Sequence, residues 1–298
     1  MATARAYTAT SGFTRDFFAV RDFLRRINAD EVATPSFLWA RWEWAHCLPY
    51  LDRTALDRIG VWESDGRIVA LATYESSLGE AYLVVDPAHR ELLPEVVDHA
   101  LANLRHADGR LAVLVPHGDT ELASLVAARG CEPAGVSEPN MRIDLASLGD
   151  VSAPDGYRLS SMADESDLWK LDRCLHSGFD HPGEAPSTDE DIHWRWVSTS
   201  APGLDRSLCI TAVAPDGEYA AYAGMWHAPS TDYALVEPVC TQREHRRRGC
   251  GRAAVLEGLR RCRERGARWG YVGSDQEFYA ALGFAPIPGD VWWRAPAT

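Results

Sequence analysis

The stretch YALVEPVCTQREHRRRGCGRAAVLEGLRRCRERG, residues 233–266, decides the fold. Its first eight residues are mostly apolar, β-branched or aromatic, which is typical of a buried strand. An arginine-rich loop follows, with Gly249 and Gly251 one residue apart, and then apolar residues recur at helical spacing over about 252–265. The stretch therefore predicts a strand, a glycine turn and a helix in immediate succession.

This loop has the composition of an anion site. The two glycines allow a sharp turn in which successive N–H groups converge, and the start of the following helix adds unpaired donors. Ten arginines lie between Arg243 and Arg268 against three glutamates, a local charge of +7 in a chain of net charge −13. The loop thus fits a pyrophosphate, although a solvated basic helix after a glycine turn is the simpler alternative. The third glycine of a dinucleotide-binding loop and the Gly-Lys of a P-loop are both missing.

Composition limits the remaining possibilities. With 298 residues, 46% hydrophobic and 24% charged, the chain has the make-up of a globular protein of about two domains. Its acidity argues against nucleic acid as a partner. It has no apolar run long enough for a membrane helix or a signal peptide, so we expect no membrane partner and a cytoplasmic location.

The metal-ligating residue types follow no binding pattern. Seven cysteines form an odd set without a CxxC pair, which predicts reduced thiols. His176, His181 and His193 are not at zinc-ligand spacing, so we predict no metal site.

The two halves of the chain repeat each other at an offset of 151 to 153 residues. Residues 42–44 (WEW) recur as 194–196 (WRW), the turn at 65–66 recurs at 216–217, and residues 82–87 recur as 233–238. Such an ordered series predicts two tandem units, residues 1–150 and 155–298, joined by a linker at 144–156. The repeated tryptophans are expected in the core.

Both units are expected to have the same α/β fold, a mixed sheet flanked by helices. In the second unit two helices begin after Asp164 and Ser187, the latter with Glu190 placed for a capping box. Strands at 207–213, 219–226 and 233–240, the loop and its helix, a strand at 269–272, a short helix at 276–282 and a closing strand follow. In the first unit we expect helices at 16–28, 36–47, 92–105 and 121–129, a hairpin turning at 65–66, and strands ending at 85 and 115.

Several motifs in this order resemble the Gcn5-related N-acetyltransferase (GNAT) family. They are EPVCT at 237–241, RxxGxGRA from Arg246, YVG at 271–273 and FYAALGF at 278–284. The resemblance implies acyl transfer from acetyl-CoA to an amine, in a cleft where the third and fourth strands splay apart. It further implies that cofactor contacts come from Val239, Cys240, Thr241, Arg246, Arg247, Arg248, Gly249, Cys250, Gly251 and Arg252.

Amine acetylation needs a base, an oxyanion donor and an acid. Glu237 is the expected base, and a carboxylate that orients the substrate or pairs with an arginine is the alternative. The N–H of Val239 is the expected oxyanion donor, because Pro238 has none. By the resemblance Tyr279 is the general acid, turned to the cleft edge while Phe278 and Leu282 face inward, and a packing aromatic is its alternative. Cys240 is expected to be buried rather than a nucleophile.

The first unit departs from this pattern. After Asp86 it has no glycine until Gly109, and Asp86 and Glu91 would repel a pyrophosphate. We therefore predict that it is a degenerate copy and that only the second unit binds acetyl-CoA, one molecule per chain.

The acceptor is the least defined part. The segment 178–195 carries Asp180, Glu184, Asp189, Glu190 and Asp191 against Arg195, which suggests a small cationic amine such as a polyamine, an aminoglycoside or an amino sugar. A solvated acidic loop explains the same residues. Trp226, Trp292 and Trp293 are either acceptor-pocket or core residues. The alternative to an enzyme is a non-catalytic acyl-CoA-binding or scaffolding protein.

Overall fold

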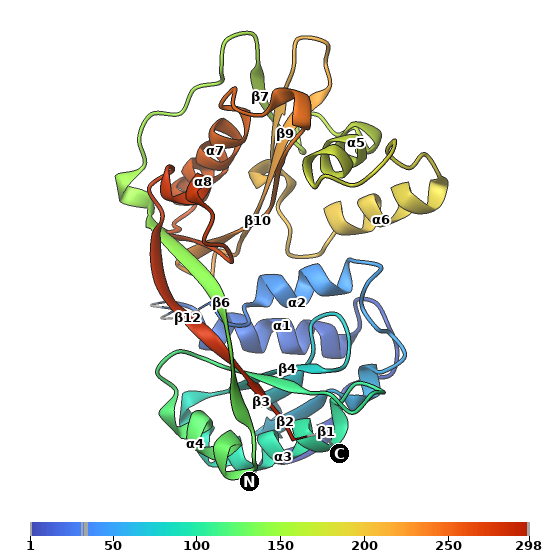
Figure 1. The fold of residues 1–298 in the computed structure, drawn as a ribbon, viewed down its shortest axis with the longest axis vertical. Coiled ribbons are helices and arrows are strands. Elements are labelled where there is room, and N and C mark those ends of the chain that lie inside the picture. Colours follow the sequence, from blue (N-terminus) through green and yellow to red (C-terminus); the bar gives the residue numbers. More distant parts are fainter. Residues whose placement is uncertain (1, 31, 33–34, 297–298) are drawn as a thin grey trace. The chain divides into compact units, whose positions relative to one another are not determined.

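The computed structural model describes residues 2–30, 32 and 35–296, and the chain forms two compact units (Figure 1). Unit 1 is Met1–Asn140 with Ile287–Thr298, and unit 2 is Met141–Pro286. The sequence repeat predicted a single boundary between the two units near residue 150. In the structure the chain returns to unit 1 after residue 286.

Unit 2 contains the arginine-rich loop. Its elements are the end of β6 (Glu132–Asp144), η3 (Leu145–Ser147), β7 (Arg158–Ser161), α5 (Leu168–Gly178), α6 (Asp189–Thr199), η4 (Arg206–Leu208), β8 (Ile210–Val213), β9 (Tyr219–His227), β10 (Tyr233–Thr241), η5 (Arg243–His245), α7 (Cys250–Glu264), β11 (Trp269–Val272), α8 (Glu277–Ala280) and the start of β12 (Ala285–Arg294).

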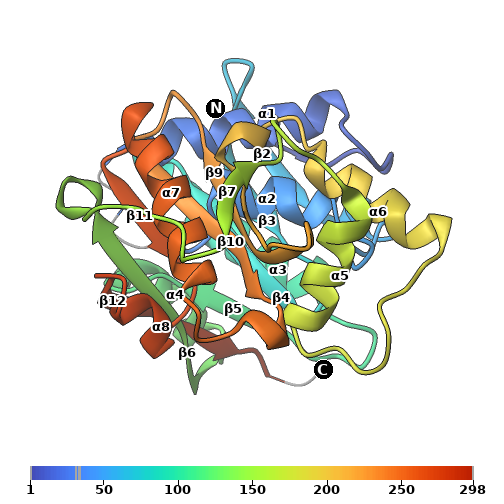
Figure 2. The same cartoon turned by 90° about the horizontal axis from the view of Figure 1, so that it is seen from above.

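These elements form a mixed sheet with helices on both faces. The strand order is β6-β11-β10-β9-β8-β7, with β10 and β11 parallel and the other pairs antiparallel. Helix α7 covers one face of β9 and β10, and α5 covers the other face (Figures 1 and 2). This confirms the predicted α/β fold class.

Unit 1 repeats the same architecture. Its elements are β1 (Thr3–Ala6), α1 (Arg15–Ile27), α2 (Trp39–His46), η1 (Leu56–Arg58), β2 (Gly60–Ser64), β3 (Arg67–Thr73), β4 (Glu80–Val85), η2 (Pro87–Leu92), α3 (Leu93–Asn103), β5 (Ala112–Val115) and α4 (Thr120–Ala128). Strands β4 and β5 are parallel, as β10 and β11 are in unit 2. The four helices of this unit were predicted to within a few residues.

The closing strands are arranged differently from the prediction. Residues 291–294 of β12 pair with β5 in unit 1, and residues 141–144 of β6 pair with β11 in unit 2. The strand expected to close the second unit therefore completes the first. A strand's sequence pattern gives its faces and not its partner, which explains the difference.

The residues at turns and helix ends explain where several helices and strands begin and end. Asp65 and Gly66 both have positive φ, as the tight turn between β2 and β3 requires. Helix α6 begins with a capping box formed by Thr188 and Asp191, one residue later than the predicted pairing of Ser187 with Glu190. The unpredicted strands β1 and β7 have only four residues each.

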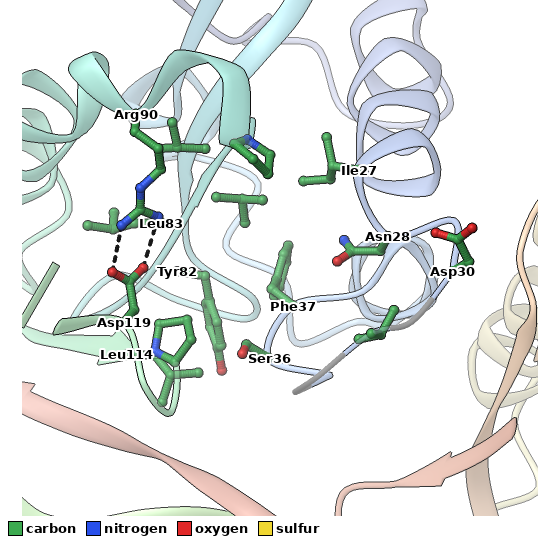
Figure 3. A pocket seen from close by; sticks show the side chains of 15 residues that line it. Ile27, Asn28, Asp30, Ser36, Phe37, Tyr82, Leu83, Arg90, Leu114 and Asp119 are labelled. Atoms are coloured by element: carbon green, nitrogen blue, oxygen red, sulfur yellow. Dashed lines mark hydrogen bonds and ion pairs between the residues drawn. The ribbon is translucent and has the colours of Figure 1, made fainter. Parts of the chain in front are cut away.

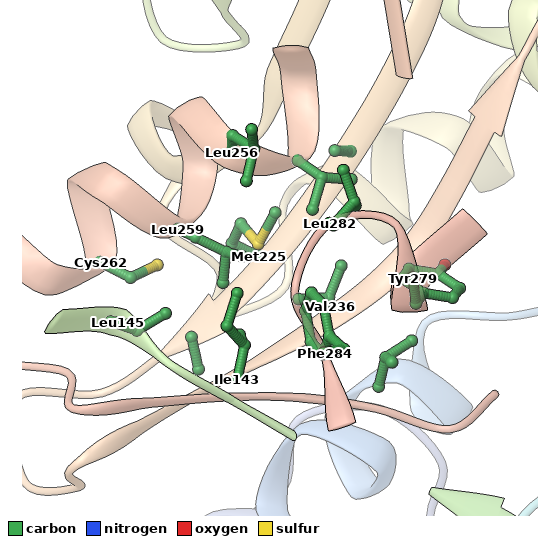
Figure 4. Packing of buried hydrophobic residues seen from close by; sticks show 14 of the residues in the cluster. Ile143, Leu145, Met225, Val236, Leu256, Leu259, Cys262, Tyr279, Leu282 and Phe284 are labelled. Carbon is green, nitrogen blue, oxygen red and sulfur yellow. The ribbon is translucent and has the colours of Figure 1, made fainter. Parts of the chain in front are cut away.

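The core of unit 2 surrounds the sheet and α7. It brings together Met225, Val236, Leu256, Leu259, Tyr279 and Phe284, all buried (Figure 4). Its alanine and glycine residues let α7 lie close to the sheet, since a Cβ at Gly258 would lie 2.7 Å from the Met225 side chain. This core fixes the strand ends that carry the predicted site residues.

Candidate active site

A bulge in β10 opens the sheet at the predicted site. Val236 faces Met225 of β9 and Val239 faces Ala223, so one extra residue of β10 lies between these two pairs. On its other edge β10 pairs with β11 only from Tyr233 to Leu235, among the residues that the structure describes. The two parallel strands thus splay apart beyond Leu235.

The opened edge of β10 presents backbone donors. The N–H of Gln242 donates to the Ala220 carbonyl on β9 at 2.9 Å. Successive residues of a strand direct their N–H groups to alternate edges, so the N–H groups of Thr241 and Val239 point away from β9. Val239 N–H therefore faces the space between the splayed strands, as an oxyanion donor requires.

Two residues of β9 hold this bulge: Trp226, expected in the acceptor pocket or the core, and Gly224, which the sequence did not single out. The buried indole of Trp226 donates from Nε1 to the main-chain carbonyl of Glu237 at 3.0 Å. A Cβ on Gly224 would lie 2.4 Å from the same carbonyl oxygen, closer than atoms can approach. A glycine inside a strand signals close backbone approach, and this was the available clue.

Replacing Gly224 with alanine should therefore disturb the site. Either β9 or the bulge must move, so we expect a loss of about 1–3 kcal/mol in the free energy of unfolding, the usual range for overpacking. Denaturant unfolding measures it. Gly149→Ala is the control, since nothing lies within 4 Å of a Cβ there. Equal stability of the two variants would contradict the close approach.

The loop after β10 ends in a cluster of unpaired amides. Gly249 is the N-cap of α7 with φ of +85°, and Arg247 also has positive φ. The first α7 amide that bonds to this turn is Ala253, which donates to the Gly249 carbonyl at 2.9 Å. No main-chain hydrogen bond of normal geometry links the amides of residues 247–252 to another described residue. Such convergent donors at the start of a 15-residue helix fit a pyrophosphate.

Gly251 keeps this cradle open. A Cβ there would lie 2.6 Å from the Thr241 hydroxyl and 3.6 Å from the Phe278 ring. Any larger side chain at this position would project into the space that the loop encloses.

Several loop arginines are already paired. Asp180, at the end of α5, accepts from Arg243 Nε at 2.7 Å and from Arg246 Nη2 at 3.0 Å. Hydrogen bonds from Arg246 and Arg243 lower the pKa of this exposed carboxyl group. Asp180 thus anchors the loop instead of lining an acidic acceptor surface, which differs from the expectation. Arg248 donates to the Tyr157 hydroxyl at 3.3 Å.

The strand edge, loop and short helix line one cavity of unit 2. Its volume is about 460 Å³, and its lining includes most of the predicted cofactor residues. These are Val239, Cys240, Thr241, Arg246, Arg247, Gly249, Cys250, Gly251 and Arg252, together with Gly178, His245 and Tyr279. Arg248 is next to this lining in sequence and turns to Tyr157.

Tyr279 lies at the junction of this cavity and the core. Its ring contacts Phe278 and Phe284 at centroid distances of 5.0 and 5.6 Å (Figure 4). It is only 7% exposed but lines the cavity, at whose edge it was expected, and Phe278 is half-buried, packing against the core while also lining the cavity. Burial, and then the charge of Glu237, raise the pKa of Tyr279 to about 12. The phenol is therefore protonated at neutral pH.

The remaining predicted residues differ in exposure. Glu237 is half-buried at the bulge, and Cys240 is buried with its Sγ 3.6 Å from Cys174 Sγ. Trp226 and Trp292 are buried, while Trp293 is half-buried. The expectation that Trp196 belongs to the core is wrong, because it is 57% exposed on α6, whose own buried residues are Ser198 and Thr199.

The comparisons with known proteins agree with this geometry. Residues 168–284 match the model of the acetyltransferase (GNAT) family. The chain is also 30% identical over 249 residues to mycothiol acetyltransferase of Nocardia farcinica, covering 78% of this chain and 81% of that protein.

Two solved structures share the whole fold. A tandem GNAT protein from the clavulanic acid biosynthesis pathway is 20% identical, with a TM-score of 0.62 and full coverage of both chains. A GCN5-related N-acetyltransferase from Sphaerobacter thermophilus is 19% identical, with a TM-score of 0.54, covering 100% of this chain and 97% of the other. No helix of the described residues has the length and apolar character to cross a membrane.

Proposed function

The chain belongs to the GNAT acetyltransferase family as a tandem protein, and from this premise we propose that unit 2 transfers an acetyl group from acetyl-CoA to a primary amine of a small cationic molecule. The single observation that carries the proposal is that one cavity of unit 2 brings three features together. It joins an open strand edge, a cluster of unpaired amides and a phenol of raised pKa.

The residues of this cavity fit acetyl-CoA. The outward N–H groups of Val239 and Thr241 match a pantetheine arm, which pairs as an extra strand would. The amides of residues 247–252 would hold the pyrophosphate at the start of α7. Bound there, acetyl-CoA supplies a thioester as the acetyl donor. Arg247 and Arg252 would add positive charge, since among the described residues their one side-chain hydrogen bond runs from Arg252 to the Ala281 carbonyl at 3.3 Å.

The residues around the bulge supply the three requirements of amine acetylation. Glu237 would accept a proton from the acceptor amine, directly or through water, so that a neutral amine attacks. Val239 N–H would stabilise negative charge that develops on the carbonyl oxygen. Tyr279 would donate its proton to the departing thiolate. After burial, the charge of Glu237 also raises the pKa of Tyr279, which supports a position of the two groups near one another.

The proposal of a cationic acceptor rests on the acidic residues that follow α5 and continue into the first turn of α6. Glu184, Asp189 and Glu190 are exposed there, although Asp180 is committed to two arginines. Such a surface would concentrate ammonium groups at low ionic strength. The relative from Nocardia farcinica adds a mycothiol-type amine to the candidates.

Turnover tests the proposal directly. Release of free CoA from acetyl-CoA should require an amine, and a panel of polyamines, aminoglycosides, amino sugars and a mycothiol-type amine should identify the class. Acetyl-CoA binding without turnover across such a panel would favour a non-catalytic acyl-CoA-binding protein. Activity on neutral or anionic acceptors alone would contradict the cationic class.

Replacing Glu237 with glutamine separates its two possible roles. As a base, Glu237→Gln should lower kcat/KM by about 10–100-fold, because water partly substitutes for it. The loss should shrink as the pH rises and more of the free amine is neutral. As an orienting carboxylate, the same change should raise KM for the amine and leave kcat nearly unchanged.

Glu244→Gln is the control for a lost carboxylate. Glu244 lies in η5 of the same loop, outside the lining of the cavity. Wild-type kinetics of Glu237→Gln at all pH values would remove Glu237 from the mechanism.

A further inference from the structure

We propose that Cys174 and Cys240 form a reversible disulfide that weakens acyl-CoA binding by unit 2. The disulfide is inferred from the geometry of the two thiols alone. Its effect rests on the proposed function, because it requires that the cavity of unit 2 binds acetyl-CoA.

The two thiols are already in contact. Cys174 lies on α5 and Cys240 on β10, and their Sγ atoms are 3.6 Å apart. Cys240 Sγ is also 3.6 Å from the Cys174 carbonyl oxygen. A disulfide has an S–S length of about 2.05 Å, so an approach of roughly 1.5 Å would form the bond. Small rotations of both side chains and a slight shift of α5 can supply that approach.

Among the seven cysteines this pair is distinctive. All seven are free and buried. Among the described residues, Cys174 and Cys240 are the two whose sulfur atoms contact one another. Cys209 belongs to the same buried cluster, but its Sγ faces the Asp205 carbonyl at 3.8 Å.

Of the two cysteines, Cys240 is the one that borders the cavity. Cys240 is part of the cavity lining, between Val239 and Thr241. Cys174 is fully buried behind it. Oxidation would therefore begin at Cys240, and Cys174 would resolve the product. Acetyl-CoA bound along the same strand edge would cover Cys240.

The surrounding contacts transmit a shift of either thiol to the cofactor site. A Cβ on Gly178 would lie 2.6 Å from Cys240 Cβ, so the end of α5 already lies directly on β10. The Gly178 carbonyl accepts from Arg246 of the loop at 2.9 Å. Drawing α5 and β10 together would displace the N–H edge of β10 or the loop arginine. Either movement would disturb acyl-CoA contacts.

The reaction balances with a low-molecular-weight disulfide as the oxidant. The Cys240 thiolate attacks this disulfide and releases one small thiol, which leaves a mixed disulfide on Cys240. Cys174 then loses its proton and attacks the Cys240 sulfur, releasing the second small thiol. Two cysteine thiols are oxidised and one small disulfide is reduced to two thiols.

Oxidised glutathione is the probe for the test, with the full chain in the absence and presence of saturating acetyl-CoA. We expect peptide mass spectrometry to find a crosslink between the peptides of Cys174 and Cys240. Calorimetry should show acetyl-CoA binding at least about tenfold weaker in the oxidised protein and restored by dithiothreitol. Bound acetyl-CoA should slow the crosslinking.

Two variants make the result specific. Cys174→Ser should stop at the mixed disulfide on Cys240, and Cys131→Ser, a buried cysteine of unit 1, should crosslink as the wild type does. Absence of the crosslink in native wild-type protein would overturn the disulfide. A crosslink with unchanged acetyl-CoA affinity would overturn its effect. Failure of the reduced protein to bind acetyl-CoA would overturn that effect and the proposed function together, while the crosslink would still decide the disulfide.

Discussion

Replacing Tyr279 with phenylalanine should lower kcat by about 10–1000-fold, the range for losing a general acid, with acetyl-CoA affinity within about twofold of wild type. The ring of Tyr279 contacts Phe278 and Phe284 within the core of unit 2, and phenylalanine preserves those contacts. Only the hydroxyl group is lost. Steady-state kinetics at saturating substrates and calorimetry of acetyl-CoA binding measure the two quantities.

The raised pKa of Tyr279 adds a pH criterion. Its phenol should stay protonated up to a pKa of about 12, above the free-phenol value of about 10. An alkaline fall in kcat with an apparent pKa near 10 would therefore contradict the raised pKa of Tyr279.

Tyr74→Phe is the matched control for the loss of a buried hydroxyl group. Tyr74 lies in unit 1, and its hydroxyl donates to the Asp52 carbonyl at 2.6 Å. This change should affect stability and leave kcat near the wild-type value. Wild-type kcat in Tyr279→Phe, with chemistry rate-limiting, would assign the acid role to water or to another side chain.

The sequence predicted the parts of the site that depend on local pattern. Two glycines before a helix specify a turn and free amides wherever the helix lies, so the loop at residues 246–252 could be predicted from a short stretch. The order of the helices and of the other strands, apart from β1, β6 and β7, followed from periodicity in the same way.

Features that depend on register and packing could not be predicted in this way. The hydrogen bond from Trp226 to the Glu237 carbonyl depends on how β9 is aligned with β10. The ion pair of Asp180 with Arg243 depends on the position of the loop beside α5. Trp196 repeats Trp44 in sequence but is exposed, because α6 is little buried against its neighbours. The partners of β6 and β12 are likewise non-local choices.

Unit 1 has the same fold as unit 2 but differs from it at the position of the glycine loop. Its strands β4 and β5 also stop pairing, after Tyr82, and a cavity of about 290 Å³ lies beside residues 83–85 (Figure 3). Here Asp86 accepts from the Ala88 N–H at 2.9 Å and from Arg26 at 2.6 Å. Despite its burial, these bonds hold the pKa of Asp86 below its usual value. The amide nearest the strand thus already donates its hydrogen bond to a carboxylate of the chain itself.

The guanidinium group of Arg90, which lines this cavity, is also paired. Arg90 forms a two-bonded ion pair with Asp119 at 2.6 and 2.9 Å, drawn across the cavity wall in Figure 3. In the part of unit 1 that the structure describes, a pyrophosphate would therefore find neither converging free amides nor an unpaired arginine at this position. We expect from this contrast that acetyl-CoA binds once per chain, in unit 2.

Replacing Gly251 with tryptophan should then abolish binding by the whole chain. The Cβ would contact the Thr241 hydroxyl at 2.6 Å, and the indole would fill the cradle beside the Phe278 ring. We expect a loss of at least about 100-fold in acetyl-CoA affinity, equivalent to about 2.7 kcal/mol. Calorimetry of the wild type should give one site, and Gly251→Trp should give none.

Gly149→Trp is the control, because a Cβ at Gly149 meets nothing within 4 Å. It should bind acetyl-CoA once, as the wild type does, and thermal unfolding should show that both variants remain folded.

A folded Gly251→Trp variant that still binds one acetyl-CoA would assign the binding site to unit 1. Two sites in the wild type, reduced to one by Gly251→Trp, would mean that unit 1 binds acetyl-CoA without a glycine loop. The carboxylate of Asp86 would then have to leave the Ala88 amide, so Asp86→Asn should change the affinity of that second site and leave the first unaltered.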